Sequence, residues 1–466
     1  MKLSDTLSNT AVLTITPKSA TGKSIFTHLE HLSLETFNEY LPPDGSIEKI
    51  EQRFRAIGAR IESSSRVGVT VSMTRALFER YWRQSFEVKR NKYIRNLSRW
   101  RYHSDSQPLS LPFLADLIED IRFPCGSFEL ANSQPPSLNR HHLKVPDDIA
   151  RVGGLIDFHR QQATGKGIKV AMIDSGLWPH PYFEAHGYNI DRQAAISLLD
   201  PMRDERGHGT AMSSVLLSVA PQIELMMMKM SCRELSFPVA AFQQAVSCDP
   251  HIINCSWGTI GHEPQLHLEV MNAIDLGIQV VFAAGNGSTD RKTAMFQSIA
   301  VPESVTVGGV FIDEQFSPSS LSDISSSFIS EVYTGRSVPD VCGPCGMLPD
   351  AQLILFPTEP GSDFDKRNGE TDGTGKEDGW LVSSGTSAAA AWVSGHTAIL
   401  MQLSPQDSNK NYKEVLRRYC QPVRRGVSAM GLEVNSNVQG SDLASGAGFV
   451  RFAKELMNDF NGNTAL

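Results

Sequence analysis

The stretch that most constrains how this chain can fold runs from Ser383 to Gly395, where a Gly-Thr-Ser turn leads into a run of alanines. Alanine loses the least conformational freedom on entering a helix, so Ser387 is predicted to lie at a helix N-terminus. Unpaired backbone N–H groups and the positive end of the helix dipole meet there. An oxyanion formed beside Ser387 would be stabilised, which makes its hydroxyl a candidate nucleophile, although such a turn also serves as a plain helix cap.

A serine hydroxyl is a weak nucleophile near neutral pH unless a base removes its proton and a carboxylate orients that base. Upstream segments carry the required groups. Asp174 ends an apolar strand, His208 lies between two glycines ahead of an apolar helix, and Asn286 follows another apolar strand. Each alone could be a turn former or a helix cap. The chain order Asp, His, Asn, Ser matches one of the known arrangements of a Ser-His-Asp triad with an amide donor for the oxyanion.

These four segments resemble the subtilisin-like serine proteases, the subtilase family, from about Gly165 to the C-terminus. The resemblance implies a peptidase that works through an acyl-enzyme. Position by position, it makes Asp174 the residue that orients the histidine and His208 the general base. It makes Ser387 the nucleophile and Asn286 the oxyanion donor.

The segment Ser256-Trp257-Gly258 resembles the family's substrate-binding edge, which pairs with an extended peptide and walls the first specificity pocket. Free backbone N–H and C=O groups at such an edge bind the substrate backbone, while pockets read its side chains. Trp257 is expected to favour apolar substrate side chains away from the scissile bond. The partners implied by the resemblance are protein or peptide substrates.

Apolar strands alternate with helices from Val145 onward, which predicts a parallel sheet with helices on both faces. Functional groups then belong at the carboxyl ends of the strands, where Asp174 and Asn286 both fall. The first hundred residues alternate strands with amphipathic helices and predict a small α+β, ferredoxin-like domain. We expect a prodomain-like domain over 1–103, a linker rich in Ser, Pro and Asn over 104–145, and a subtilisin-like peptidase domain over 146–466.

The first domain resembles subtilase prodomains, which implies an inhibitor of its own protease domain and a folding aid. A permanently attached regulatory or recognition domain is the alternative. If the first domain is removed, cleavage is expected in the linker, because backbone must be exposed to enter a protease cleft.

The net charge of −8 argues against a nucleic-acid-binding protein. The basic aromatic stretch Lys89–His103 is expected to be one basic helix face rather than a site for single-stranded nucleic acid. No apolar run is long enough to span a membrane, and the N-terminus is too polar for a signal peptide. Seven scattered cysteines favour the reducing cytoplasm, with export by a route that needs no N-terminal signal as the alternative.

No cofactor is predicted. Cys342 and Cys345 enclose a Gly-Pro pair, which we interpret as a structural turn. The acidic, Gly-rich segment 359–378 is expected to be a solvated loop. Calcium prefers such oxygens, but their spacing matches no ligand pattern. The segment Ala447–Met457 is expected to be a closing helix.

One departure from the family concerns the helix of the serine. Many subtilases have a proline and a histidine where this chain has Ala391 and Trp392. This puts in question the rate and the balance between water and an amine as acyl acceptor. We expect a serine endopeptidase restrained by its first domain. The alternatives are a transacylase or peptide cyclase that uses the same triad, and an inactive binding scaffold.

Overall fold

The computed structural model describes residues 9–90, 98–102, 109, 111–124, 127–128, 142–232, 235–259, 261, 263–287, 298–346, 353–369, 371–404, 411–423, 444–453 and 456. None of the helices in this part of the chain has the length and hydropathy that crossing a membrane requires.

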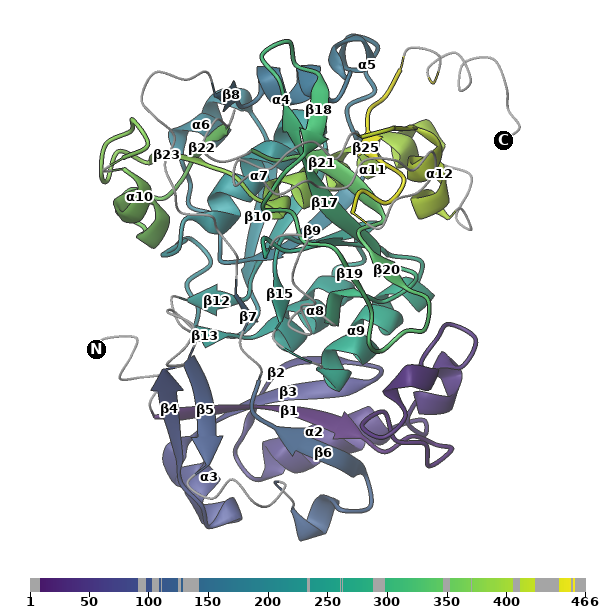
Figure 1. The fold of residues 1–466 in the computed structure, drawn as a ribbon. Helices are drawn as coiled ribbons and strands as arrows, with labels where there is room; N and C mark the ends of the chain where they lie inside the picture. The colour runs from purple at the N-terminus through teal and green to yellow at the C-terminus, as the bar shows by residue number, and fades with distance from the viewer. Residues whose placement is uncertain are drawn as a thin grey trace.

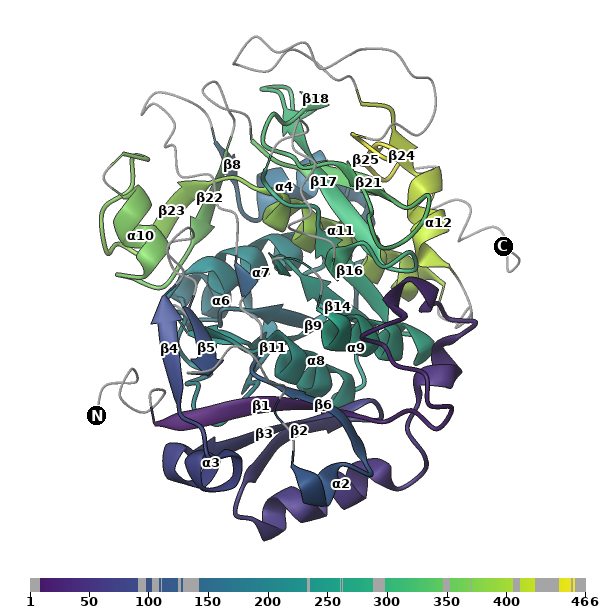
Figure 2. The same ribbon diagram turned by 60° about the horizontal axis from the view of Figure 1, so that its bottom comes forward.

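A large twisted sheet forms the core of the C-terminal part (Figures 1 and 2). Its strands lie in the order β10-β11-β9-β14-β16-β17-β21-β25-β24, with β18 paired to β17. All neighbours from β10 to β25 in this order are parallel. Their bounds are β9 (Lys169–Asp174), β10 (Asn189–Ala194), β11 (Glu224–Lys229), β14 (Ile252–Cys255), β16 (Gln279–Ala283), β17 (Val305–Ile312), β18 (Pro318–Leu321), β21 (Val341–Pro344), β24 (Cys420–Gln421) and β25 (Phe449–Val450).

Helices cover this sheet on both sides, which confirms the predicted fold class. Alternate residues of a strand point to opposite faces. Ala171 and Ile173 of β9 therefore join one apolar cluster, and Val170 and Met172 join another. The first cluster includes residues of α8 (Pro238–Ser247) and α9 (Pro264–Asp275); the second includes residues of α7 (His208–Val219) and α11 (Thr386–Leu403).

The N-terminal part forms a separate antiparallel sheet with the order β2-β3-β1-β6. Two helices follow its strands in a β-α-β-β-α-β sequence, the arrangement of ferredoxin-like domains. Figure 1 shows these helices on the face of the sheet that points away from α8 and α9. The elements are β1 (Thr10–Pro17), α2 (Ser46–Ala56), β2 (Arg60–Ser65), β3 (Gly68–Thr74), α3 (Arg75–Trp82) and β6 (Ile118–Arg122).

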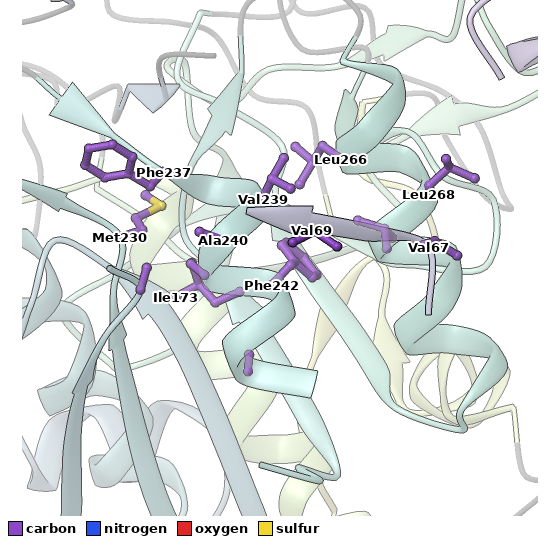
Figure 3. Packing of buried hydrophobic residues seen from close by; sticks show 14 of the residues in the cluster. Val67, Val69, Ile173, Met230, Phe237, Val239, Ala240, Phe242, Leu266 and Leu268 are labelled. Atoms are coloured by element: carbon purple, nitrogen blue, oxygen red, sulfur yellow. The ribbon is translucent and has the colours of Figure 1, made fainter. Parts of the chain in front are cut away.

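The opposite face of this small sheet packs on α8 and α9. Figure 3 shows Val67 and Val69 beside Phe242 and Leu268, and all four side chains are buried. They belong to a single apolar cluster that runs from the first domain into the face of the large sheet. The first domain therefore shares a continuous core with the rest of the chain.

The predicted linker over 104–145 is wrong in its described parts, because they pair as strands with other segments. β6 is an edge strand of the first sheet, so the first domain extends beyond residue 103. β7 (Ser127–Phe128) pairs with β15 (Gly258–Thr259), and β8 (Leu143–Lys144) pairs with β22 (Ile354–Pro357). The strand partners are far away in sequence, so a local pattern of Ser, Pro and Asn could not reveal the pairing.

The predicted basic helix is also wrong in its described part. β4 (Phe86–Arg90) and β5 (Ser98–Tyr102) form an antiparallel pair, while residues 91–97 and 103 lie outside the described residues. Arginines alternate with aromatic residues from Arg99 to Tyr102, and this period of two suits a strand rather than a helix.

Three C-terminal predictions need correction. Cys342 and Cys345 are free buried thiols, and Cys342 lies in strand β21 of the large sheet instead of a turn. The segment expected as a solvated acidic loop contains α10 (Asp363–Asn368). The described start of the expected closing helix contains strand β25, which pairs with β21 and β24.

Candidate active site

Asp174 and His208 meet at the carboxyl edge of the large sheet. Asp174 is the last residue of β9 and His208 the first residue of α7. His208 Nδ1 lies 2.8 Å from Asp174 Oδ1. Asp174 is fully buried and His208 is 4% exposed. A carboxylate at Nδ1 favours the tautomer with the proton on that nitrogen, which leaves Nε2 able to accept one.

Asp204 is a second carboxylate that bonds to residues next to this pair, and the sequence analysis missed it. Asp204 Oδ2 accepts hydrogen bonds from the backbone N–H of Thr210 at 2.8 Å and from its hydroxyl at 2.6 Å. Asp204 Oδ1 accepts from Gly207 N at 2.9 Å and from the Ser175 hydroxyl at 2.7 Å. Asp204 thus binds the N-terminal turn of α7 and the residue after Asp174. The available sequence signal was an acidic side chain just ahead of a helix start.

Asp204 is completely buried, and burial raises the pKa of its carboxyl to about 6 although four donors favour the charged form. Protonation at lower pH would weaken the hydrogen bonds to Ser175 and Thr210. These bonds connect the start of α7, which carries His208, to the residue that follows β9.

Ser387 is the second residue of α11, as the alanine-rich pattern predicts. Its hydroxyl donates to the backbone oxygen of Ser256 at 2.8 Å, and the Ser256 hydroxyl donates to the backbone oxygen of Ser387 at 2.8 Å. These reciprocal bonds join the start of α11 to the segment after β14. They bring two predicted site residues, 131 positions apart in the chain, into direct contact.

His208 and Ser387 line the same small pocket. Apolar and polar side chains line it, and the Phe364 ring of α10 stands edge-on to the His208 ring, with centroids 5.8 Å apart and an interplanar angle of 75°. The sequence analysis missed Phe364 because it lies in the segment interpreted as a loop. The other lining residues are Ala211, Met212, Phe356, Leu381, Ser383, Ser384, Gly385 and Ala388.

Asn286 lies beside the start of α11. Its Oδ1 accepts from Thr386 N at 2.8 Å and from the Thr386 hydroxyl at 2.9 Å. These bonds fix which end of the amide is the oxygen, and a Cβ built on Gly385 would come within 2.7 Å of Nδ2. The Asn286 amide group therefore lies against the turn that leads into Ser387, and only glycine leaves room for it at position 385.

The predicted substrate-binding segment lies at the end of β14. Gly258 pairs with Phe128 in the short antiparallel ladder between β15 and β7. In this structure the edge is therefore occupied by a strand of the same chain. The side chain of Trp257 differs from expectation, because it is only 2% exposed. Its indole donates to Ile173 O at 2.6 Å and packs against Phe282, so it anchors the strand end in the core instead of facing a substrate pocket.

Several acidic side chains of segment 359–378 bind backbone amides, while Glu359 pairs with Arg203 and Glu377 with Lys366. Asp365 Oδ2 accepts from Gly361 N at 2.7 Å, and Asp372 Oδ2 accepts from Val382 N at 2.9 Å. Across the described residues, no group of three or more His, Cys, Asp or Glu side chains is arranged to hold a metal ion.

A parallel sheet with an Asp-His pair and a helix-terminal serine at its carboxyl edge is the architecture of the subtilisin-like class. The chain belongs to the subtilase family, because the family model (Subtilase family, Peptidase_S8) matches residues 165–448. It is thus a subtilisin-like serine protease, and its substrates are proteins or peptides.

Similar curated proteins are also proteases. Serine protease AprX of Bacillus subtilis is 28% identical over 321 residues, which cover 62% of this chain and 70% of AprX. M-protease of Shouchella clausii is 26% identical over 319 residues, which cover 65% of this chain and 68% of that protein.

Solved structures share the fold. Fervidolysin from Fervidobacterium pennivorans, a keratinolytic enzyme related to subtilisin, aligns with a TM-score of 0.55 at 16% identity. The alignment covers 98% of this chain and 62% of fervidolysin. A lanthipeptide protease aligns with a TM-score of 0.50 at 20% identity, over 66% of this chain and 93% of that structure.

Proposed function

We propose that this chain hydrolyses peptide bonds with Ser387 as the nucleophile, His208 as the general base and Asp174 as the residue that orients the imidazole. The observation that carries the proposal is the 2.8 Å contact between Asp174 Oδ1 and His208 Nδ1, next to a pocket that His208 shares with Ser387. The contact leaves Nε2 as the proton acceptor, which is what a serine nucleophile needs.

The reaction begins when Ser387 Oγ attacks the scissile carbonyl carbon and its proton passes to His208 Nε2. The carbonyl oxygen becomes an oxyanion, which the Asn286 amide and the Ser387 backbone N–H stabilise. The imidazolium then protonates the leaving amine, and the C–N bond breaks to give an acyl ester on Ser387. Water attacks this ester with His208 again as base, which frees the acid product and Ser387. These steps require no metal or organic cofactor.

Substrate binding is coupled to the freeing of the nucleophile. In this structure the Ser387 hydroxyl donates to the Ser256 carbonyl. A peptide that adds as a strand to the Ser256–Gly258 edge presents its own N–H groups to carbonyls of that edge. We infer that this competition releases the Ser387 hydroxyl toward His208.

The first domain acts as a restraint on the site. Its chain continues from β6 into β7, and β7 occupies the Gly258–Thr259 edge in the antiparallel manner expected of a substrate. A substrate must displace this strand to pair with the same residues. The shared apolar core of the first domain with α8 and α9 keeps the strand close to the edge.

Replacement of the nucleophile tests the proposal. Ser387→Ala is expected to lower kcat for a peptide substrate by at least about 10⁴-fold, since removal of one triad member costs about this much or more. Ser214→Ala is the matched control, because that buried hydroxyl bonds to Ala211 O within α7, at 2.6 Å. Peptide hydrolysis that Ser387→Ala leaves unchanged would disprove the assignment.

A further inference from the structure

Three polar side chains interrupt the apolar contact between the first domain and the helices that carry it. Gln243 lies on α8, and Gln265 and Glu269 lie on α9; each is at most 1% exposed. All of them make hydrogen bonds to residues of the first domain. A polar cluster in this position costs stability unless it is satisfied.

Hydrogen bonds from both sides converge on one carboxylate oxygen. Glu269 Oε1 accepts from the Ser65 hydroxyl of the first domain at 3.0 Å. It also accepts from Gln243 Nε2 at 2.9 Å and from Gln265 Nε2 at 3.1 Å. The other oxygen, Oε2, is buried without a hydrogen-bond partner. The carboxyl group is therefore only half satisfied while the domains are in contact.

Further hydrogen bonds from the first domain determine how the Gln243 amide is oriented. Gln243 Oε1 accepts from the hydroxyls of Ser63 and Thr70, both at 2.7 Å. Gln243 is thereby oriented with its amide N–H group toward Glu269. The docked first domain thus supplies one donor to Glu269, the Ser65 hydroxyl, and orients a second, the Gln243 amide.

Within the part of the chain that the structure describes, the hydrogen bonds to Glu269 come from neutral donors, and no cation pairs with its carboxylate. Strands β1 and β3 and helix α8 carry no charged residue. Arg66, in the turn between β2 and β3, bonds to Asn272 and pairs with Asp275. On β2, Arg60 lies 3.7 Å from Glu62, and Glu62 Oε2 accepts from Ser197 N at 2.9 Å. Within α9, His267 Nδ1 contacts the Tyr333 hydroxyl at 2.9 Å.

Burial is therefore the main influence on the pKa of Glu269. It raises the pKa of Glu269 to about 7, against the opposing effect of the three donors Gln243, Ser65 and Gln265. If the first domain leaves, this face of α9 meets water, and the carboxyl returns toward its ordinary pKa of 4.5. Docking and protonation of Glu269 favour each other.

We propose that docking of the first domain on α8 and α9 is coupled to proton uptake by Glu269, so that the first domain is held tightly in weak acid and released more readily as the pH rises. The consequence for activity rests on the proposed role of this domain as a restraint, whereas the docking equilibrium is measurable without activity.

The sign follows from linkage. The docked state binds the proton more tightly than the undocked state. The affinity of the first domain for the rest of the chain is therefore highest below the undocked pKa of 4.5. It falls by up to tenfold per pH unit and levels off above the docked pKa of about 7. Between pH 5 and pH 7.5 the expected weakening is about 50-fold from this one group.

The test uses the full Ser387→Ala chain, which an added protease cuts once within residues 129–141. Both pieces stay in the sample, so their association can be measured. The dissociation constant of the pieces is measured from pH 5 to pH 8.5 at constant ionic strength by dilution and gel filtration. We expect about 50-fold weakening between pH 5 and pH 7.5, and a flat profile for Glu269→Gln, which is neutral at every pH. Glu62→Gln, at the same interface, is the matched control and should keep the slope.

A profile of the starting chain without this slope, or the same slope in Glu269→Gln, overturns the proposal. A second measurement on the uncut Ser387→Ala chain does not require the Gln variant to dock. With ¹³C-labelled glutamate, an infrared band of a protonated carboxyl should titrate near pH 7; its absence also overturns the proposal.

These readouts separate the inference from the proposed function. Failure of Ser387 as the nucleophile leaves the docking measurements unaffected, because they use the Ser387→Ala background. A pH-dependent docking equilibrium with no change in the activity of the intact enzyme would instead refute the restraint.

Discussion

At the scale of single residues, the proposed oxyanion site depends on close contact between Asn286 and the turn before Ser387. Thr386 holds the Asn286 oxygen with its backbone N–H and its hydroxyl, and the nitrogen end lies against Gly385. The sequence predicted Asn286 because it follows an apolar strand. The contribution of Thr386 was not predictable, since the two residues lie 100 positions apart.

Gly385→Ala tests this contact. The added methyl group would lie 2.7 Å from Asn286 Nδ2, so the amide must move away from the oxyanion. We expect kcat to fall by about 10²-fold with a smaller change in KM, the effect of losing one oxyanion donor. The measurement is steady-state peptide hydrolysis by Gly385→Ala, Asn286→Ala and the double variant.

The double variant supplies the control. If the methyl group acts by displacing the amide, its effect disappears once Asn286 is alanine, and the two losses do not add. Fully additive losses in kcat would show that Gly385 matters for another reason.

At the scale of elements, a chain of buried hydrogen bonds joins the middle of α11 to Ser256, just after β14. The Ser394 hydroxyl donates to Asn254 Oδ1 at 2.9 Å, and Asn254 Nδ2 donates to the Ser256 hydroxyl at 3.0 Å. Ser256 in turn donates to the backbone oxygen of Ser387. The helix that carries Ser387 is thus held in a fixed position relative to β14.

Ser394→Ala breaks this chain at its far end and leaves Asn254 Oδ1 buried and unpaired. We expect a loss of about 1–3 kcal/mol in the free energy of unfolding, together with a reduced kcat as Ser256 loses its support. Denaturant unfolding and peptide hydrolysis measure the two effects.

Ser214→Ala again serves as the matched control for that variant. Its buried hydroxyl bonds to Ala211 O within α7 at 2.6 Å, so its removal should cost at most about 1 kcal/mol. Equal effects of the two substitutions on stability and on kcat would contradict the positioning role of Ser394.

The elements that local patterns predicted are those with continuous apolar strands, such as β9 and β16, and the alanine-rich start of α11. The parallel sheet follows from them because such strands are buried on both faces. The pattern failed at β25, which is two residues long and stabilised by its neighbours β21 and β24. It also failed at α10, whose Ser362 cap and buried Phe364 sit inside a sequence rich in acidic residues and glycine.

At the scale of the whole molecule, the first domain and the protease part share one apolar core, and β7 pairs with β15 (Figure 1). Two distinct regions were predictable from the change in pattern between the first hundred residues and the alternating strands and helices that begin near Val145. Their docking was not, because Val69 and Phe242 are distant in sequence and share a cluster only in the folded chain. The burial of Glu269 was likewise not predictable, since a glutamate in an amphipathic helix is normally expected on the exposed face.

The account as a whole requires that Ser387 reacts and that His208 activates it. The most direct measurement is peptide mapping by mass spectrometry after reaction with a peptidyl phosphonate, which serine proteases attack as they attack a carbonyl. The account predicts one adduct, on Ser387, in the starting chain and none on the folded Ser387→Ala or His208→Gln chains. An adduct on another residue, or labelling that persists in either variant, would contradict it.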